Sequence, residues 1–178
     1  MELLMIMIVL VAILCLLLGT GLFGAPWIPS SRGIVRKMLS MAGVKPEDVV
    51  YDLGSGDGRI MITAASEFHA RSVGIEINPL WVFWTRLIVT ILGLMDQAKV
   101  VWGNFFREDL SKANIVTLYL LQGTNDRLKS KLERELKPGT RVVSHVFTFA
   151  GWDPVKVDTE SKIYVYTMKN QNQKELFP

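Results

Sequence analysis

Cysteine and histidine are nearly absent from this chain of 178 residues. Cys15 is the single cysteine, and His69 and His145 are the two histidines. One cysteine cannot form an internal disulfide or a cysteine-based metal cluster. Two histidines far apart in the chain also argue against a histidine-rich metal site, so we expect no bound metal. The length corresponds to one domain that is able to bury a substantial core.

Charge is absent from Leu3–Phe23, an apolar stretch of 21 residues. A helix of this length spans the roughly 30 Å hydrocarbon layer of a bilayer. A core helix of this composition would need burial on every face, which a small domain does not offer. A cleaved signal peptide would begin with Lys or Arg, whereas this chain begins with Glu2. Residues 1–24 are therefore predicted to be a single transmembrane anchor.

The charges around this stretch predict its orientation. Arg32, Arg36 and Lys37 follow it, and Glu2 is the only charged side chain before it. The positive-inside rule then places the body of the chain on the cytoplasmic face of the membrane, after a proline-containing linker at 25–31. A net charge of +3 suits an anionic membrane surface but is too small to predict a nucleic-acid partner.

The most informative motif is V-V-Y-D-L-G-S-G-D-G-R at 49–59. An apolar, β-branched run predicts a buried parallel strand, and the glycines then lead into a helix at 60–68. Glycines allow close approach of a ligand, and the free N–H groups of a helix start favour a negatively charged group. A second strand at 72–77 places Glu76 at its carboxyl end, where an acid suits ribose hydroxyls. The pattern predicts a nucleoside-cofactor site.

The glycine spacing distinguishes between cofactors. A dinucleotide fingerprint requires glycine at position 59, where this chain has Arg59. The G-x-G-x-G pattern, with an acid before it and Glu76 after it, resembles the S-adenosylmethionine site of class I (seven-strand) methyltransferases. The resemblance implies an α/β fold with a Rossmann-like, doubly wound, mostly parallel sheet. It also implies that Glu76 holds the ribose and that the methionine end is held by Asp52, Gly54, Ser55, Gly56, Asp57 and Gly58.

The rest of the pattern fits one methyltransferase domain at 32–170, followed by a polar tail at 171–178. Ser31 is a plausible N-cap for a helix at 33–42. Further strands are predicted at 98–102, 115–121, 140–147 and 162–168, and an amphipathic helix is predicted at 125–136. By family resemblance, Asn104 and Phe105 contact the adenine ring, although Phe105 is equally compatible with a place in the core.

The stretch Pro79–Met95 is unusual because Arg86 is its only charge. A helix at the surface of such a domain normally has one polar face. We expect this helix to lie in the membrane interface or against the anchor, with Trp81, Trp84 and Arg86 near lipid headgroups. The alternative is burial by a second protein chain, and the oligomeric state stays open.

Several motifs in order resemble one subfamily. P-W-I-P-S, G-I-E-I-N-P, G-N-F-F, L-K-P-G-T-R-V-V-S-H and G-W-D-P, together with the glycine motif, are similar to small archaeal protein-lysine methyltransferases. They are also similar to the mitochondrial group that methylates the ATP synthase c-subunit and the adenine nucleotide translocase. The likeness covers Ala25–Met168 and implies transfer of a methyl group to lysine in a protein substrate, here a membrane-associated one. One departure is Val146, where the archaeal pattern has an acid after His145.

The residues of the lysine channel are less clearly marked. Tyr119, His145 and Trp152 are candidates, but a strand histidine and a packing tryptophan explain two of them equally well. Leu120-Leu121-Gln122 replaces the N/D-P-P-Y/F motif of enzymes that methylate adenine amino groups or glutamine amides. A lipid or small-molecule methyltransferase and a non-catalytic S-adenosylmethionine-binding membrane protein remain alternatives. Nucleic acid is not expected as a partner, because no basic stripe with interleaved aromatics is present.

Overall fold

The computed structural model describes residues 2, 3, 5–8, 10 and 29–169. Seven strands form one sheet in the order β3-β2-β1-β4-β5-β7-β6. The first five of these pair in parallel, and β7 runs antiparallel to both β5 and β6. This order confirms the predicted doubly wound, mostly parallel sheet. The elements are α2 (Arg32–Ala42), β1 (Val49–Leu53), α3 (Arg59–Phe68), β2 (Arg71–Glu76), α4 (Pro79–Ile91), β3 (Ala98–Trp102), β4 (Ile115–Leu118), α5 (Gln122–Glu135), β5 (Arg141–His145), β6 (Lys156–Asp158) and β7 (Ile163–Thr167).

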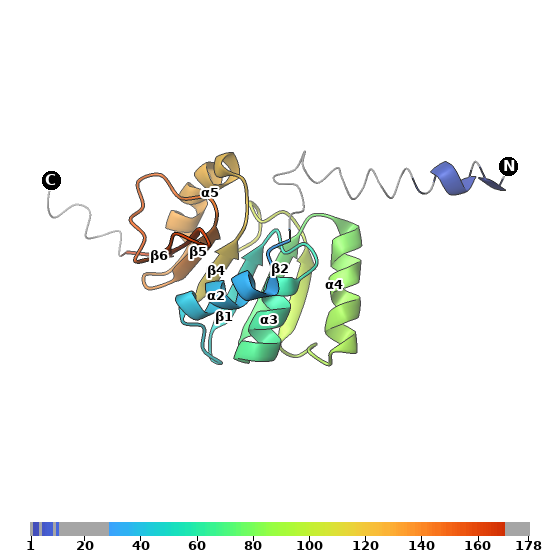
Figure 1. Cartoon of the computed structure of the whole chain (residues 1–178), viewed down its shortest axis with the longest axis horizontal. Helices are drawn as coiled ribbons and strands as arrows, with labels where there is room; N and C mark the ends of the chain where they lie inside the picture. The colour runs from blue at the N-terminus through green and yellow to red at the C-terminus, as the bar shows by residue number, and fades with distance from the viewer. Residues whose placement is uncertain (1, 4, 9, 11–28, 170–178) are drawn as a thin grey trace, which may run out of the picture.

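Helices cover both faces of the sheet, which therefore forms the middle of three layers (Figure 1). The helices α2, α3 and α4 lie on one face, where their apolar stripes pack against the strands in two buried clusters. The helix α5 covers the other face through Leu128 and Leu132, which join a third cluster with Val116 and Leu118 of β4. Alternate side chains of a strand point to opposite faces, so both layers draw on the same strands.

Most predicted elements are confirmed, and the differences lie at their ends. The predicted strand at 115–121 stops at Leu118, and the helix predicted from residue 125 begins at Gln122. The prediction missed β6 entirely and treated its residues as a connection. Its three residues are exposed or half-buried, so β6 lacks the apolar alternation by which strands are detected. Ser31 is confirmed as the N-cap of α2, since its hydroxyl accepts a hydrogen bond from the Ile34 amide.

The N-terminal prediction falls mainly outside the described residues. Within 2, 3, 5–8, 10 and 29–169, no helix combines the length and apolar character needed to cross a bilayer. Residues 11–28 and 170–178, which include most of the predicted anchor and linker and the whole tail, lie outside the described part. The described positions near the N-terminus are helical, and their large apolar side chains, such as Leu3, Ile6 and Leu10, are exposed.

Arg141 fixes α2 against the sheet. Its guanidinium donates to both carboxylate oxygens of Asp48, at 2.9 and 2.8 Å, and to the carbonyl oxygens of Ala42 and Gly43, each at 2.7 Å. Asp48 is buried, and the two carbonyls belong to the C-terminal end of α2. The side chain thus satisfies one buried charge and two helix-end acceptors that have no partner within the helix.

Replacing Arg141 should therefore lower the stability of the fold much more than replacing an arginine in an exposed ion pair. We expect Arg141→Met to lower the free energy of unfolding by about 3 kcal/mol, because it leaves the Asp48 carboxylate buried and unpaired. Arg36→Met is the matched control, since Arg36 also makes a two-bond pair, with Glu67, but on the surface. Urea unfolding of the full chain measures both, and equal midpoints for the two variants would contradict this account.

Candidate cofactor and substrate site

The strand order reverses direction between β1 and β4, and at the carboxyl ends of such strands open α/β sheets form a ligand-binding crevice. From β1 the sheet continues through β2 and β3 on one side and through β4 and β5 on the other. The connections that follow β1 and β4 therefore diverge, and open α/β sheets bind ligands at such a switch point. The glycine loop, residues 54–58, follows β1 directly and lies at this edge.

The glycine loop keeps a conformation that other residues rarely adopt. Gly54, Gly56 and Gly58 all have positive φ, at 74°, 53° and 78°. At Gly58 a β-carbon would lie 2.4 Å from the Cγ2 atom of Thr85, so a side chain there would force α4 away from the loop. The Thr85 hydroxyl also donates to the Gly56 carbonyl, at 3.1 Å. Sequence reasoning missed Thr85, because a threonine within an apolar helix gives no signal that its hydroxyl faces the loop.

Glu76 is buried at the end of β2 and faces the glycine loop. Its carboxylate accepts hydrogen bonds from the backbone amides of Gly56 and Asn78, both at 2.8 Å. Two fixed N–H groups orient both oxygens of the carboxylate. The predicted acid therefore lies beside the predicted loop, although the two are 20 residues apart in sequence. Its assigned contact with ribose stays a prediction.

Asp52 lies buried beneath the loop with half of its carboxyl group unpaired. The Thr117 hydroxyl of β4 donates to its Oδ1 atom at 2.9 Å. Its Oδ2 atom and the Ser55 hydroxyl are buried without a hydrogen-bond partner in the described part of the chain. Burial raises the pKa of Asp52 to about 7, and the hydrogen bond from Thr117 only partly offsets this effect. Thr117 was also missed, because its role depends on the register between β1 and β4.

A chain of polar contacts joins the glycine loop to β5. The Asp57 carboxylate pairs with Arg59, whose guanidinium also donates to the Ser30 carbonyl at 2.5 Å. The Ser30 hydroxyl lies 3.0 Å from Nδ1 of His145. Burial lowers the pKa of His145, so its ring is neutral at pH 7. Ser30 and Arg59 were not predicted as part of the site. Ser30 lies 29 residues before Arg59 and 115 residues before His145, and no local pattern links positions so far apart.

The structure brings together two of the three predicted channel residues. Tyr119 follows β4 and His145 ends β5, and their rings lie 4.3 Å apart between centroids. Trp152 instead stacks on Phe149 at 4.6 Å and donates its indole N–H to Glu133 at 2.8 Å. Trp152 therefore belongs to the packing on the α5 face of the sheet, whereas the Tyr119–His145 pair lies at the crevice edge.

Two further features bear on the substrate side. Val146 has φ of 70°, which is rare for a β-branched residue, and its amide donates to the Lys162 carbonyl at 2.7 Å. Strained positions of this kind concentrate at functional sites. Phe105 is buried in the core with Leu53 and Ile75, and the Asn104 side-chain oxygen accepts from the Phe106 amide at 3.0 Å. Neither arrangement tests the predicted adenine contacts.

Comparison with known proteins agrees with this geometry. A model of the family described as the ANTKMT methyltransferase domain matches residues 52–156, which run from Asp52 beneath the glycine loop to the first residue of β6. The chain belongs to this family. Membership confirms the prediction that the chain is a class I, S-adenosylmethionine-dependent methyltransferase. It also confirms the predicted similarity to protein-lysine methyltransferases.

Individual relatives extend this result. A protein-lysine N-methyltransferase of Saccharolobus islandicus (strain REY15A) is 49% identical over 133 residues, 74% of this chain and 83% of that protein. The Xenopus laevis lysine N-methyltransferase that is named for the ATP synthase c-subunit is 30% identical over 142 residues, and the match covers 80% of this chain but 62% of that protein. A crystal structure described as an RNA methyltransferase from Salinibacter ruber in complex with S-adenosyl-L-homocysteine has a TM-score of 0.78 and 42% identity, with 85% of this chain and 97% of that chain covered.

The residues at the crevice suit S-adenosylmethionine. The cofactor carries hydroxyl, amine and carboxylate groups, and the unpaired Asp52 Oδ2 and Ser55 hydroxyl offer partners for polar groups of this kind. When bound, it supplies a methyl group on a sulfonium, which needs no further activation. The chain's own residues would hold and orient the cofactor. Two backbone amides fix the Glu76 carboxylate, and the Thr85 hydroxyl of α4 bonds to the Gly56 carbonyl of the loop.

Removing the Glu76 carboxylate should weaken cofactor binding. We expect Glu76→Ala to cost roughly 1–3 kcal/mol of binding free energy, because the Gly56 and Asn78 amides and the cofactor's hydroxyls lose their acceptor. Calorimetric titration with S-adenosylhomocysteine measures the loss. Glu47→Ala is the control, since Glu47 is exposed in the turn before β1. Equal affinity in both variants would overturn the placement of the ribose at Glu76.

The buried carboxyl of Asp52 should make stability depend on pH. Because its pKa is raised from 3.8 to about 7, the folded chain keeps a proton that the unfolded chain releases above pH of about 4. The free energy of unfolding should therefore fall as pH rises between these two values and show no further change from this group above them. In Asp52→Asn this slope should be lost while Glu47→Gln retains it, as followed by urea unfolding at several pH values. An unchanged slope in Asp52→Asn would contradict the raised pKa.

Proposed function

We propose that this chain is a membrane-anchored methyltransferase that transfers a methyl group from S-adenosylmethionine to the ε-amine of lysine in protein substrates. The single observation that carries the lysine specificity is the 49% identity with a protein-lysine N-methyltransferase over most of both chains. The Xenopus laevis relative, which is also named for lysine methylation, supports the same substrate class.

The crevice supports this chemistry in two ways. A lysine amine has an ordinary pKa near 10.4, so it must lose a proton before it attacks the methyl group. Burial disfavours the charged amine, and the Tyr119–His145 ring pair at the carboxyl ends of β4 and β5 offers a surface against which an amine would lose water. Burial also lowers the pKa of His145 and keeps its ring neutral, so it adds no positive charge that would repel an approaching lysine.

The membrane part of the proposal rests on sequence and on the described N-terminal residues. The uncharged stretch Leu3–Phe23 has the length of a span. Its described positions are helical with exposed aliphatic side chains, as expected of a helix that contacts lipid. The basic residues that follow it favour a cytoplasmic location for the catalytic domain. A substrate in or near the same membrane follows from this arrangement.

Two other substrate classes compete with lysine. The Salinibacter ruber structure, at 42% identity, is described as an RNA methyltransferase, so RNA is the second candidate. A lipid substrate is the third, and it would fit the proposed membrane location. A chain that binds the cofactor without transferring its methyl group is the fourth reading.

A labelling experiment separates these four readings. The full-length chain is incubated with methyl-labelled S-adenosylmethionine and with membranes and RNA from its own source. The label is then measured in the protein, lipid and RNA fractions. We expect label in a protein band, and mass spectrometry of that band should place the methyl group on lysine.

The control for this experiment is Gly56→Arg, which puts a long side chain into the glycine loop and should abolish all labelling. Label in RNA or in lipid alone would replace lysine by that substrate. Cofactor binding with no label in any fraction would overturn the enzymatic proposal.

A further inference from the structure

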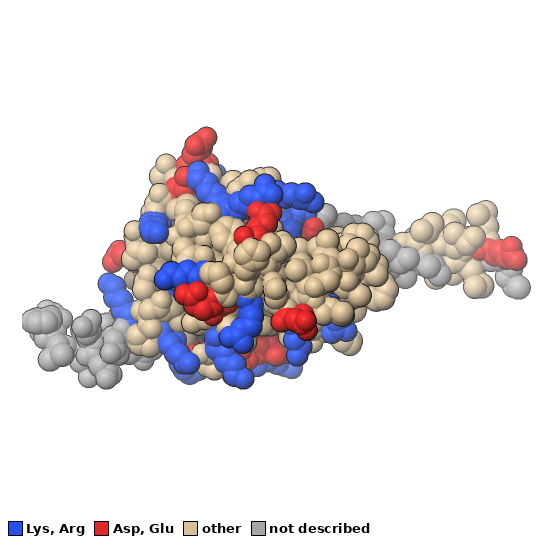
Figure 2. Space-filling view, turned by 90° about the horizontal axis from the view of Figure 1, so that it is seen from below, with Lys and Arg blue, Asp and Glu red and all other residues tan. Residues whose placement is uncertain are grey.

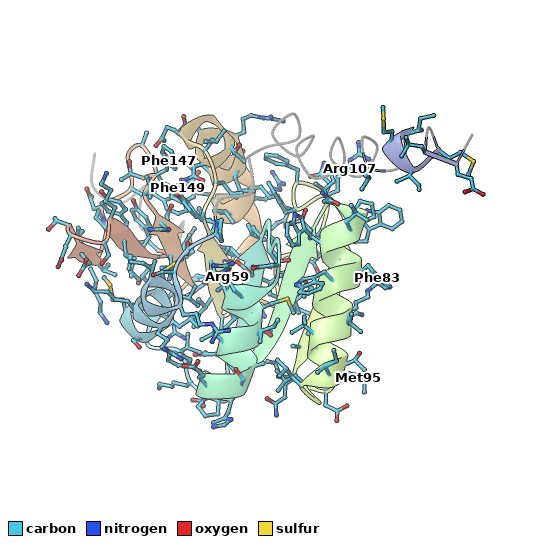
Figure 3. All side chains as sticks on the ribbon, turned by 45° about the vertical axis from the view of Figure 1, so that its right-hand side comes forward. Arg59, Phe83, Met95, Arg107, Phe147 and Phe149 are labelled. Carbon is cyan, nitrogen blue, oxygen red and sulfur yellow. The ribbon has the colours of Figure 1, made fainter. Side chains whose placement is uncertain are left out.

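One face of α4 and of the turn after it is apolar and exposed. Phe83, Leu87, Ile91 and Met95 follow one another at intervals of four residues and are 70%, 42%, 67% and 65% exposed. This spacing places Phe83, Leu87 and Ile91 on one side of α4, and Met95 follows in the turn after the helix. We call these four residues the α4 stripe. Figure 3 shows Phe83 and Met95 on the outer side of α4, and Figure 2 shows a mostly uncharged surface on that side of the domain.

The opposite face of α4 already has its partners. Val82 and Val89 are buried in a cluster with α3 and β3, and Thr85 contacts the glycine loop. The helix is therefore fixed by its inner face, and the exposure of the α4 stripe does not result from loose packing. A monomeric water-soluble domain rarely exposes four large apolar side chains in one row.

The surroundings of the stripe indicate which partner covers it. Trp84 and Trp102 are also exposed, and Arg86 is the only charged residue within α4. Exposed indole rings next to apolar side chains and an arginine are typical of segments that lie at a lipid–water interface. Asp96, an exposed acid directly after Met95, ends this apolar stretch.

The position of Ser30 is compatible with contact between the α4 stripe and a membrane surface. Its carbonyl is bonded to Arg59, and the residue before Arg59, Gly58, packs against Thr85 on the inner face of α4. Residues 24–29 join Ser30 to the uncharged stretch that precedes them, and six residues extend over at most about 20 Å. If that stretch spans the bilayer, Ser30 stays within this distance of the bilayer surface.

We propose that the α4 stripe lies in the interface of the lipid bilayer, so that the domain contacts the membrane at two places. Because Thr85 joins α4 to the Gly56 carbonyl, the cofactor loop then lies behind a single helix, about 10 Å in diameter, that separates it from the membrane. This inference rests on the membrane location in the proposed function but not on its lysine specificity. A second copy of the chain, and the chain's own apolar N-terminal segment, are the other possible occupants.

Site-directed spin labelling of the full chain tests this contact. In a Cys15→Ser background, a nitroxide is attached to Leu87→Cys or Ile91→Cys, both on the α4 stripe. Glu47→Cys is the matched control, since Glu47 is exposed in the turn between α2 and β1. The protein is bound to vesicles of phosphatidylcholine and phosphatidylglycerol. Collision rates with oxygen, which dissolves in lipid, and with a water-soluble nickel complex are then compared.

At residues 87 and 91 we expect the ratio of oxygen to nickel collisions to be several-fold higher than at residue 47. A ratio equal to that at residue 47 would overturn the proposal. Low collision rates with both reagents would also overturn it, because they indicate burial against protein. Dipolar broadening between labels would then identify a second copy, and its absence would identify the chain's own N-terminal segment.

Flotation of the same labelled samples through a density gradient keeps this test separate from the proposed function. Loss of flotation in every sample would overturn both the anchor and the α4 contact. Lysine specificity has no influence on either measurement, so its failure would appear only in the methyl-labelling experiment.

Discussion

The hydrogen bond from the Gly56 amide to the Glu76 carboxylate holds the cofactor site together. It joins the loop after β1 to the end of β2, and a second amide, from Asn78, fixes the same carboxylate from the start of α4. The Thr85 hydroxyl of α4 donates to the Gly56 carbonyl. Both the amide and the carbonyl of Gly56 are therefore hydrogen-bonded to neighbouring elements. Gly54, Gly56 and Gly58 have positive φ, a conformation that glycine adopts without strain, and these hydrogen bonds select it.

The parts of the site that were predicted from sequence are those that depend on local pattern. The glycines, Asp52 and Glu76 were predicted because the chain turns from strand to helix at a fixed spacing, and the sheet order then brings them together. Thr85 and Thr117 were missed, because a single hydroxyl in an apolar segment gains meaning only from strand and helix register. The short strand β6 was missed for the opposite reason, since its three residues carry no apolar pattern.

Long-range contacts explain the mixed outcome on the substrate side. Tyr119 and His145 were predicted from their strand ends, and parallel pairing of β4 with β5 places them together. Trp152 lies in the connection between β5 and β6, where it packs against Phe149 and bonds to Glu133. The sequence was compatible with Trp152 either in the lysine channel or in the packing of the core. The loop after β5 decides between them, and it begins with Val146 in the left-handed conformation, which no local rule predicts.

The two edge strands of the sheet, β3 and β6, also limit self-association. An exposed strand edge offers unpaired amides and carbonyls to the edge of another molecule, and this pairing starts aggregation. Here β6 forms one edge with only three residues, and the Lys156 ammonium at its start bonds to the Met41 carbonyl at 3.1 Å. The other edge, β3, carries the exposed Lys99. Charge and short length therefore block edge-to-edge growth, which allows the domain to crowd on a surface without forming intermolecular sheets.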